Sequence, residues 1–144
     1  MNPTPSVSLL PLPGGRTAWH LDEHYTFQWS HNGTRYRFTI PRGFTFDGAS
    51  IPWFLPWGRG RLGLVAPLVH DWLIEVGGEV TVDSYRSVNF VVGWHYLGER
   101  RFSRRDADRL FFRILRERGV RPRWLRRWAF RFVRMWSLIR GDFY

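Results

Sequence analysis

Alternating apolar and polar residues predict a β-hairpin in the first third of the chain. Every second residue over 25–29 is aromatic, and the same period of two returns over residues 36–40, where each intervening residue is polar. Between these runs, His31-Asn32-Gly33 has the composition of a tight turn. We therefore expect two antiparallel strands within residues 25–40, each with one apolar face.

A helical period appears next. Apolar residues at positions 66, 69 and 73 predict a helix over residues 66–76. This helix should end at Gly77-Gly78, because glycine adopts the backbone conformation that closes a helix. Residues 78–101 fit neither period. Their Val, Phe and Tyr content favours strand, but residues 87–96 could also extend a helix, and the sequence leaves both alternatives open.

The end of the chain predicts two more helices. Ser103 and Asp106 have the spacing of a capping box, in which each side chain bonds the backbone of the other. The helix that they open should stop at Gly119. Pro122, a residue favoured in the first helical turn, begins another that reaches about Arg140.

These elements predict an α+β fold in one domain over residues 1–144. An N-terminal β-hairpin or small antiparallel sheet would pack on a C-terminal set of three or more helices. Residues 1–15 are expected to form an extended N-terminal arm. Residues 100–144 are expected to form a basic, aromatic helical hairpin.

Composition changes this picture mainly through charge. Residues 100–144 hold 15 arginines against four carboxylates, whereas residues 1–99 are nearly neutral. The chain has no Cys, which excludes disulfides and thiolate metal sites. No apolar run approaches the roughly 20 residues of a membrane span. The N-terminus lacks the charged region of a signal peptide.

The last predicted helix combines this charge with aromatic residues. Its candidates for partner binding lie at helical spacing: Arg123, Arg127, Arg131, Arg134, Trp124 and Trp128. Three interpretations stay open, namely a solvated basic face, contact with an acidic protein or nucleic acid, and a helix at a membrane interface. No nucleic-acid motif is present, so sequence-specific reading of DNA is not expected.

Candidate chemistry centres on His70 and Asp71, which stand inside an apolar helix. Adjacent residues on a helix point about 100° apart, so Asp71 is poorly placed to orient His70. Asp108, in an apolar setting on the next helix, is the better partner. Asp71 would then be free to bind a hard cation such as calcium. The competing interpretation is a buried pair that only satisfies its own hydrogen bonds.

Asp47 and Ser50 form a second polar group in apolar sequence. Both residue types cap turns and helices through bonds to nearby backbone N–H groups. We interpret them as the scaffold of their own loop or as a wall of the same site.

Three segments resemble domain-of-unknown-function family 1353: the runs over residues 40–52, 66–73 and 103–111. Members occur in bacteriophages, prophages and bacteria, and the family has no settled activity. The resemblance covers roughly residues 25–140. It implies that the signature positions here are Asp47, Ser50, His70, Asp71 and Asp108. The chain departs from the family in having Ile74 where a Tyr is common, and in a longer segment over residues 78–101.

The His-Asp helix is also similar to that of secreted calcium-dependent phospholipases. By that similarity His70 would be the catalytic base, Asp108 its orienting residue and Asp71 the calcium ligand, with loop carbonyls from Gly58, Gly60 and Gly63. The absence of Cys, the presence of Ile74, and the positive charges of Arg59 and Arg61 depart from that plan.

Our leading functional hypothesis from the sequence is a phage- or prophage-derived virion or morphogenesis protein. It would be tail-associated, contain a buried His-Asp centre, and bind other virion or assembly proteins or copies of itself, in the virion or the host cytoplasm. The alternative is a calcium-dependent hydrolase of phospholipid or another ester. A second alternative is an accessory protein associated with nucleic acid or membrane.

Overall fold

The computed structural model of the chain describes residues 2–15, 17–46 and 65–117 and five later positions: Trp124, Arg127, Arg131, Arg134 and Met135. Those five later positions have helical backbone. The elements follow in the order β1 (Val7–Pro11), a short 3-10 helix (Pro13–Gly15), β2 (Thr17–Leu21), β3 (Tyr25–His31), β4 (Thr34–Ile40), β5 (Thr45–Phe46), α2 (Val65–Glu75), β6 (Glu79–Val88), β7 (Val91–Arg101) and α3 (Arg104–Glu117).

The strands form two antiparallel sheets. One has the order β1-β2-β5, and the other has the order β3-β4-β6-β7. The chain passes directly from β2 to β3 and from β4 to β5, so the two sheets are continuous through these paired segments. At the junction, the N–H of Leu21 donates to the carbonyl of Phe44 at 2.9 Å, and the N–H of Gly43 donates to the carbonyl of Leu21 at 2.8 Å.

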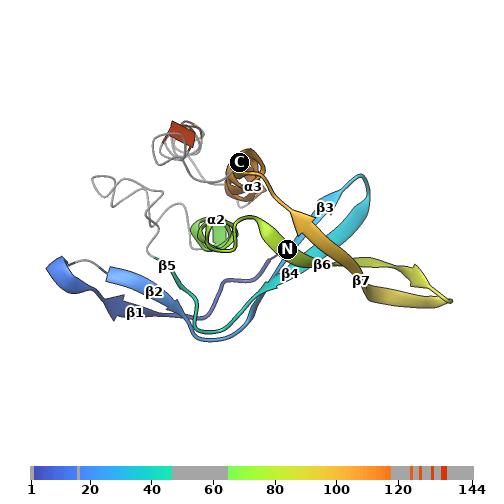
Figure 1. Cartoon of the computed structure of the whole chain (residues 1–144), viewed down its shortest axis with the longest axis horizontal. Helices are drawn as coiled ribbons and strands as arrows, with labels where there is room; N and C mark the ends of the chain where they lie inside the picture. Colours follow the sequence, from blue (N-terminus) through green and yellow to red (C-terminus); the bar gives the residue numbers. More distant parts are fainter. Residues whose placement is uncertain are drawn as a thin grey trace.

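Both helices lie on one side of the strands, and α2 lies between α3 and the sheets (Figure 1). This arrangement gives α2 apolar neighbours on nearly every side, and all but four of its residues are buried. The inward face of the larger sheet and the link between β7 and α3 supply an aromatic cluster with ring centroids 5.5 to 6.4 Å apart: Phe27, Trp29, Phe38 and Phe102. The core therefore joins the sheet to the helix pair that positions the candidate site.

The predicted β-hairpin is confirmed as β3 and β4. Its turn residues Asn32 and Gly33 both have positive φ, at 49° and 78°, as the favoured two-residue hairpin turn requires. Inward residues of β3 are buried and outward residues are more exposed, which follows the alternation in the sequence.

The helix ends also follow their sequence signals. α2 ends before Gly77 and Gly78, whose φ angles are 65° and 82°, and the N–H of Gly78 donates to the carbonyl of Leu73 at 2.7 Å. At the start of α3, the N–H of Ser103 donates to Asp106 and the N–H of Asp106 donates to the hydroxyl of Ser103, both at 3.1 Å. This is the predicted capping box.

The predicted fold class is wrong. In place of a small sheet on three or more C-terminal helices, the described residues contain seven strands in two sheets and two α-helices with defined bounds, of which only α3 follows the last strand. The main difference lies in residues 78–101, which form the long β6–β7 hairpin. Its apolar residues occupy both faces near the tip, and this removes the period of two by which a strand is normally recognised.

The N-terminal segment was expected to be an extended arm. It is extended, but β1 pairs with β2 along five residues. Ahead of β1, the hydroxyl of Tyr25 donates to the carbonyl of Pro3 at 2.7 Å, and the side chain of Asn2 bonds the backbone of Gln28. Among the described residues, no helix is long and apolar enough to cross a bilayer.

Candidate active site

The packing of α2 against α3 brings His70 and Asp108 together. Their side chains are 0% exposed, and Nε2 of His70 lies 2.7 Å from Oδ1 of Asp108. The rings of His70 and Phe111 also make a T-shaped contact, with centroids 5.5 Å apart. The sequence predicted this pairing across two helices, and the structure has it.

Asp71 lies on the other side of the imidazole ring. Its Oδ1 is 3.8 Å from Nδ1 of His70, a separation too long for a hydrogen bond. Its side chain keeps 14% exposure, so it contacts solvent at the edge of the buried centre. The two ring nitrogens of His70 therefore face two different carboxylates, one buried and one partly exposed.

Two guanidinium groups complete the surroundings of Asp108. Nη1 of Arg134 lies 3.1 Å from Oδ2 of Asp108, and Nε of Arg104, one helical turn before Asp108, lies 3.6 Å from Oδ1. With His70 neutral, the positive charges of these two arginines balance the negative charges of Asp71 and Asp108. Protonation of His70 would leave the cluster with an excess positive charge.

Opposing influences set the pKa of His70. Burial lowers this pKa, because the charged imidazolium loses its hydration. The hydrogen bond to Asp108, the proximity of Asp71 and the negative charge of both carboxylates raise it by more. The pKa of His70 is therefore raised above its ordinary value of 6.5.

This shift predicts how stability changes with pH. The folded state holds the His70 proton more tightly than the unfolded state, so the stabilisation is complete below about pH 6.5 and is lost as pH rises through the folded-state pKa. We expect the unfolding free energy of the wild type to fall over that range relative to a His70→Gln variant. Urea unfolding at about pH 6 and about pH 9 measures the difference. A difference that grows with pH would contradict the assignment.

The sequence interpretation missed Arg104 and Arg134 as members of this centre. The sequence places Arg134 in the basic stripe as a partner-binding residue, yet it lies against Asp108 with 28% exposure. The other described members of the stripe, Trp124, Arg127 and Arg131, are exposed. Spacing alone places Arg104 four residues before Asp108 on one helix, which is the signal that could have found it.

The two kinds of arginine give a matched comparison. Arg134→Gln should lower the unfolding free energy by about 1–3 kcal/mol, because it removes a charged hydrogen bond to a buried carboxylate. Arg131→Gln changes the same charge on an exposed site and should stay within about 0.5 kcal/mol of the wild type. Chemical denaturation followed by tryptophan fluorescence measures both. Equal effects would show that the contact with Asp108 contributes nothing to stability.

Four of the predicted site residues lie outside the described residues: Asp47, Ser50, Arg123 and Trp128. The glycine loop suggested by the phospholipase similarity lies outside them too. Among the residues that are described, no three His, Asp or Glu side chains converge as metal ligands. Asp71 has the hard oxygen donors that calcium prefers, so calcium binding there stays a prediction.

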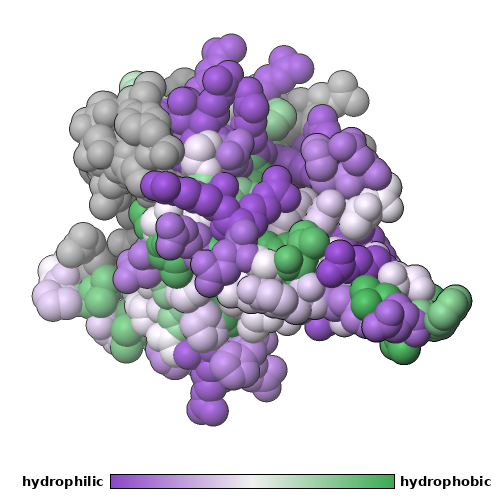
Figure 2. Space-filling model, turned by 45° about the vertical axis from the view of Figure 1, so that its right-hand side comes forward, coloured by the Kyte–Doolittle hydropathy of each residue, from purple (hydrophilic) through white to green (hydrophobic). Residues whose placement is uncertain are grey.

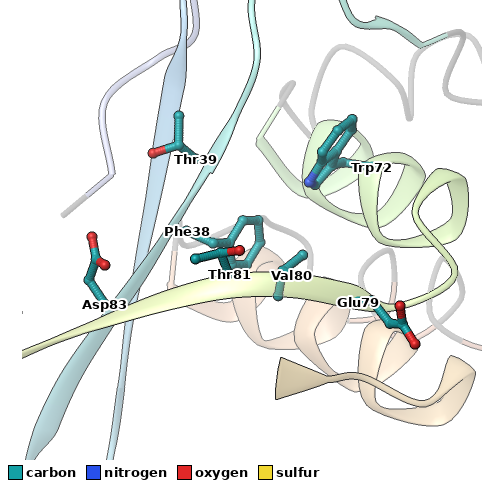
Figure 3. A pocket seen from close by; sticks show the side chains of 7 residues that line it. All are labelled: Phe38, Thr39, Trp72, Glu79, Val80, Thr81 and Asp83. Carbon is teal, nitrogen blue, oxygen red and sulfur yellow. The ribbon is translucent and has the colours of Figure 1, made fainter. Parts of the chain in front are cut away.

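A separate cavity of about 330 Å³ lies between α2 and the larger sheet (Figure 3). The register pairs β4 with β6 at Tyr36–Ser84 and Arg37–Asp83, and the cavity lies next to this short ladder. Its lining comes from α2 and both strands: Phe38, Thr39, Trp72, Glu79, Val80, Thr81 and Asp83. Since neither His70 nor Asp108 is among them, this cavity is distinct from the buried centre.

The fold and the site together define a β-rich protein with a buried His–Asp pair, flanked by arginines, between two packed helices. The chain belongs to the family described as protein of unknown function (DUF1353), whose sequence profile matches residues 19–133. That match includes both helices of the site. Comparison with curated proteins and with solved structures finds no match to this chain.

Proposed function

We propose that the protein is a hydrolase in which His70 activates water for attack on a carboxylic ester. The orientation of the imidazole carries the proposal: Nε2 contacts Asp108 at 2.7 Å, while Nδ1 faces Asp71. In the neutral ring the proton lies on Nε2, because this nitrogen makes the shorter contact, 2.7 Å against 3.8 Å, with a carboxylate that can only accept. Nδ1 is then the nitrogen that can take a proton. A lone pair in a fixed direction is what a general base requires.

In the proposed reaction, Nδ1 of His70 takes a proton from water while the water oxygen bonds to the ester carbonyl carbon. The tetrahedral intermediate then breaks its bond to the alkoxide, and Nδ1–H gives the proton to the departing oxygen. Ester and water become carboxylic acid and alcohol, and His70 returns to its neutral form. Asp108 acts as a positioning residue that fixes the ring and stabilises the transient imidazolium.

In this proposal, the substrate approaches the imidazole ring from the side that faces Asp71. Asp108 and His70 are 0% exposed at their side chains, whereas Asp71 keeps 14% exposure and lies 3.8 Å from Nδ1. Asp71, which is partly exposed, therefore lies on the Nδ1 side of the ring.

The proposed substrates are phospholipids or other carboxylic esters, and the proposed cofactor is calcium at Asp71. When bound, a calcium ion supplies polarisation of the ester carbonyl. The donor type at Asp71 supports this assignment.

A substrate and cation screen tests the proposal. The wild type should hydrolyse a short-chain ester or phospholipid vesicles in calcium, and chelation should reduce the rate. Asp71→Asn should lose the calcium dependence, while Asp83→Asn, at a partly exposed carboxylate on β6 that pairs with Arg37, should keep it. Absence of hydrolysis from every ester, with calcium leaving the melting temperature unchanged, would overturn the proposal.

A second candidate function is the virion or morphogenesis role, in the virion or the host cytoplasm. The observation that favours it is the exposed row of Trp124, Arg127 and Arg131, since Arg and Trp are enriched where proteins meet. It predicts that the isolated chain self-associates or binds purified tail proteins of the phage that encodes it. A clean monomer by light scattering, with no binding to those proteins, would contradict it. Salt-sensitive binding to DNA would instead favour the accessory role.

A further inference from the structure

The tip of the β6–β7 hairpin presents an aromatic side chain entirely to solvent. Phe90 is 102% exposed, and the two turn residues Asn89 and Phe90 have φ angles of 51° and 66°. The second position of such a turn normally holds glycine, because a side chain there is strained. The chain therefore keeps a bulky apolar residue at the apex despite a conformational cost.

Apolar residues surround this apex on both faces of the hairpin. Val91 and Val92 are 61% and 65% exposed, and consecutive strand residues point to opposite faces. The hairpin projects beyond the body of the protein (Figure 1), and Figure 2 shows apolar side chains gathered at its end, at the lower right. A protein partner bound to one face of the hairpin would leave the other apolar face exposed to water, whereas the acyl region of a lipid layer would cover both faces.

Aromatic and cationic groups lie about 10 Å behind the Val88–Val91 pair that closes the turn, three residue pairs back along the ladder. Tyr85 pairs with Trp94 there, and their rings meet edge-on at 5.5 Å. The guanidinium of Arg35 lies 4.2 Å from the ring centre of Tyr85, and that of Arg37 lies 4.6 Å from the ring centre of Trp94. Arg37 also pairs with Asp83, so the unbalanced charge rests more on Arg35.

The distal hairpin carries no opposing charge. Residues 85–96 contain no Asp or Glu, and Arg86 is exposed, with its guanidinium bonded to the carbonyl of Tyr96. An apolar tip, a level of Tyr and Trp behind it, and arginine at that same level match the layers of a lipid interface.

We propose that the β6–β7 hairpin docks the protein on an anionic phospholipid surface. Phe90, Val91 and Val92 enter the acyl boundary, Tyr85 and Trp94 lie among the headgroups, and Arg35 and Arg86 contact lipid phosphates. This surface is separate from the His70 centre, and the docking does not depend on any reaction there.

Binding of the full chain to vesicles tests the docking. The probe is a vesicle of phosphatidylglycerol mixed with phosphatidylcholine, compared with phosphatidylcholine alone, in chelator so that no calcium contributes. Phe90→Gly is the central variant, because glycine relieves the strained turn while it removes the apolar apex. Leu9→Ser is its control, since Leu9 is another exposed apolar residue, at 61%, but lies on β1, in the other sheet.

We expect the wild type to bind the anionic vesicles and Phe90→Gly to bind at least tenfold more weakly, as loss of one buried aromatic side chain predicts. Leu9→Ser should remain within about twofold of the wild type, and Arg35→Gln should weaken binding mainly at low salt. The melting temperature of Phe90→Gly should be no lower than that of the wild type. This result would exclude misfolding as the cause of the weaker vesicle binding.

Because the chain has no Cys, Phe90→Cys offers a single thiol for a polarity-sensitive dye. The dye should shift toward the blue on anionic vesicles, and the same dye on Leu9→Cys should not. If the wild type and Phe90→Gly bind the vesicles equally, the binding must come from another part of the chain, such as the basic C-terminal region. That result would overturn the proposal. Absence of vesicle binding, with a dimer that Phe90→Gly dissociates, would assign the tip to a second copy of the chain and also overturn it.

Discussion

Asp108→Asn is expected to lower the unfolding free energy by about 3 kcal/mol, the largest stability loss expected from any single change in the site. The carboxylate is 0% exposed and receives Nε2 of His70 at 2.7 Å and Nη1 of Arg134 at 3.1 Å, with Arg104 at 3.6 Å. Asparagine keeps the size of the side chain but removes the negative charge. Arg104, which is buried, and Arg134 would then face a neutral amide, and this leaves their positive charges uncompensated.

Asp83→Asn provides the matched control for this loss. Asp83 also pairs with an arginine, Arg37 at 3.0 Å, but both side chains are about one-third exposed. Exposed pairs contribute little, so this change should cost no more than about 1 kcal/mol. Guanidinium unfolding followed by tryptophan fluorescence measures both variants. Losses of the same small size would show that the His70–Asp108 centre does not stabilise the fold.

His70→Gln is expected to reduce ester hydrolysis by about 10²- to 10⁴-fold, the loss typical of removing a general base. Glutamine can still bond Asp108 in the space of the ring, but it has no titratable nitrogen to take a proton from water. His31→Gln is the control, because His31 is exposed at the end of β3. In His70→Gln, the KM for the ester should change far less than kcat. A His70→Gln enzyme as active as His31→Gln would identify the pair as purely structural.

Local signals in the sequence predicted those parts of the fold that local chemistry determines. The alternation over residues 25–40 and the Asn32-Gly33 turn specify the β3–β4 hairpin without any distant contact. Ser103 and Asp106 likewise fix the start of α3 through bonds to each other's backbone. The end of α2 follows from glycine at positive φ.

The remaining strands lack such a local signal and were not predictable in this way. β1 is exposed along most of its length, so no buried face marks it, and β5 is only two residues long, too short to show any period. β6 and β7 carry apolar residues on both faces near the tip, so alternation disappears where the hairpin leaves the body of the protein. Pairing of β4 with β6 joins residues nearly fifty positions apart.

The candidate site shows the same division. The angle between adjacent helical residues was enough to separate Asp71 from Asp108 as partners of His70. Spacing could not reveal that Arg134, among several arginines on one helical stripe, would contact Asp108, because that depends on how distant segments pack. Two packed helices therefore assemble a charged cluster of which the sequence indicated only the histidine and the carboxylates.

The central claim, that His70 acts as a base, is tested most directly by the pH dependence of kcat/KM for ester hydrolysis by the wild type. A base must be neutral to act, and the pKa of His70 is raised above 6.5. The rate should therefore rise about tenfold per pH unit below that pKa and level off above it, at a midpoint that matches the His70 titration followed by NMR. A profile that is flat or falls through the same range would contradict the account.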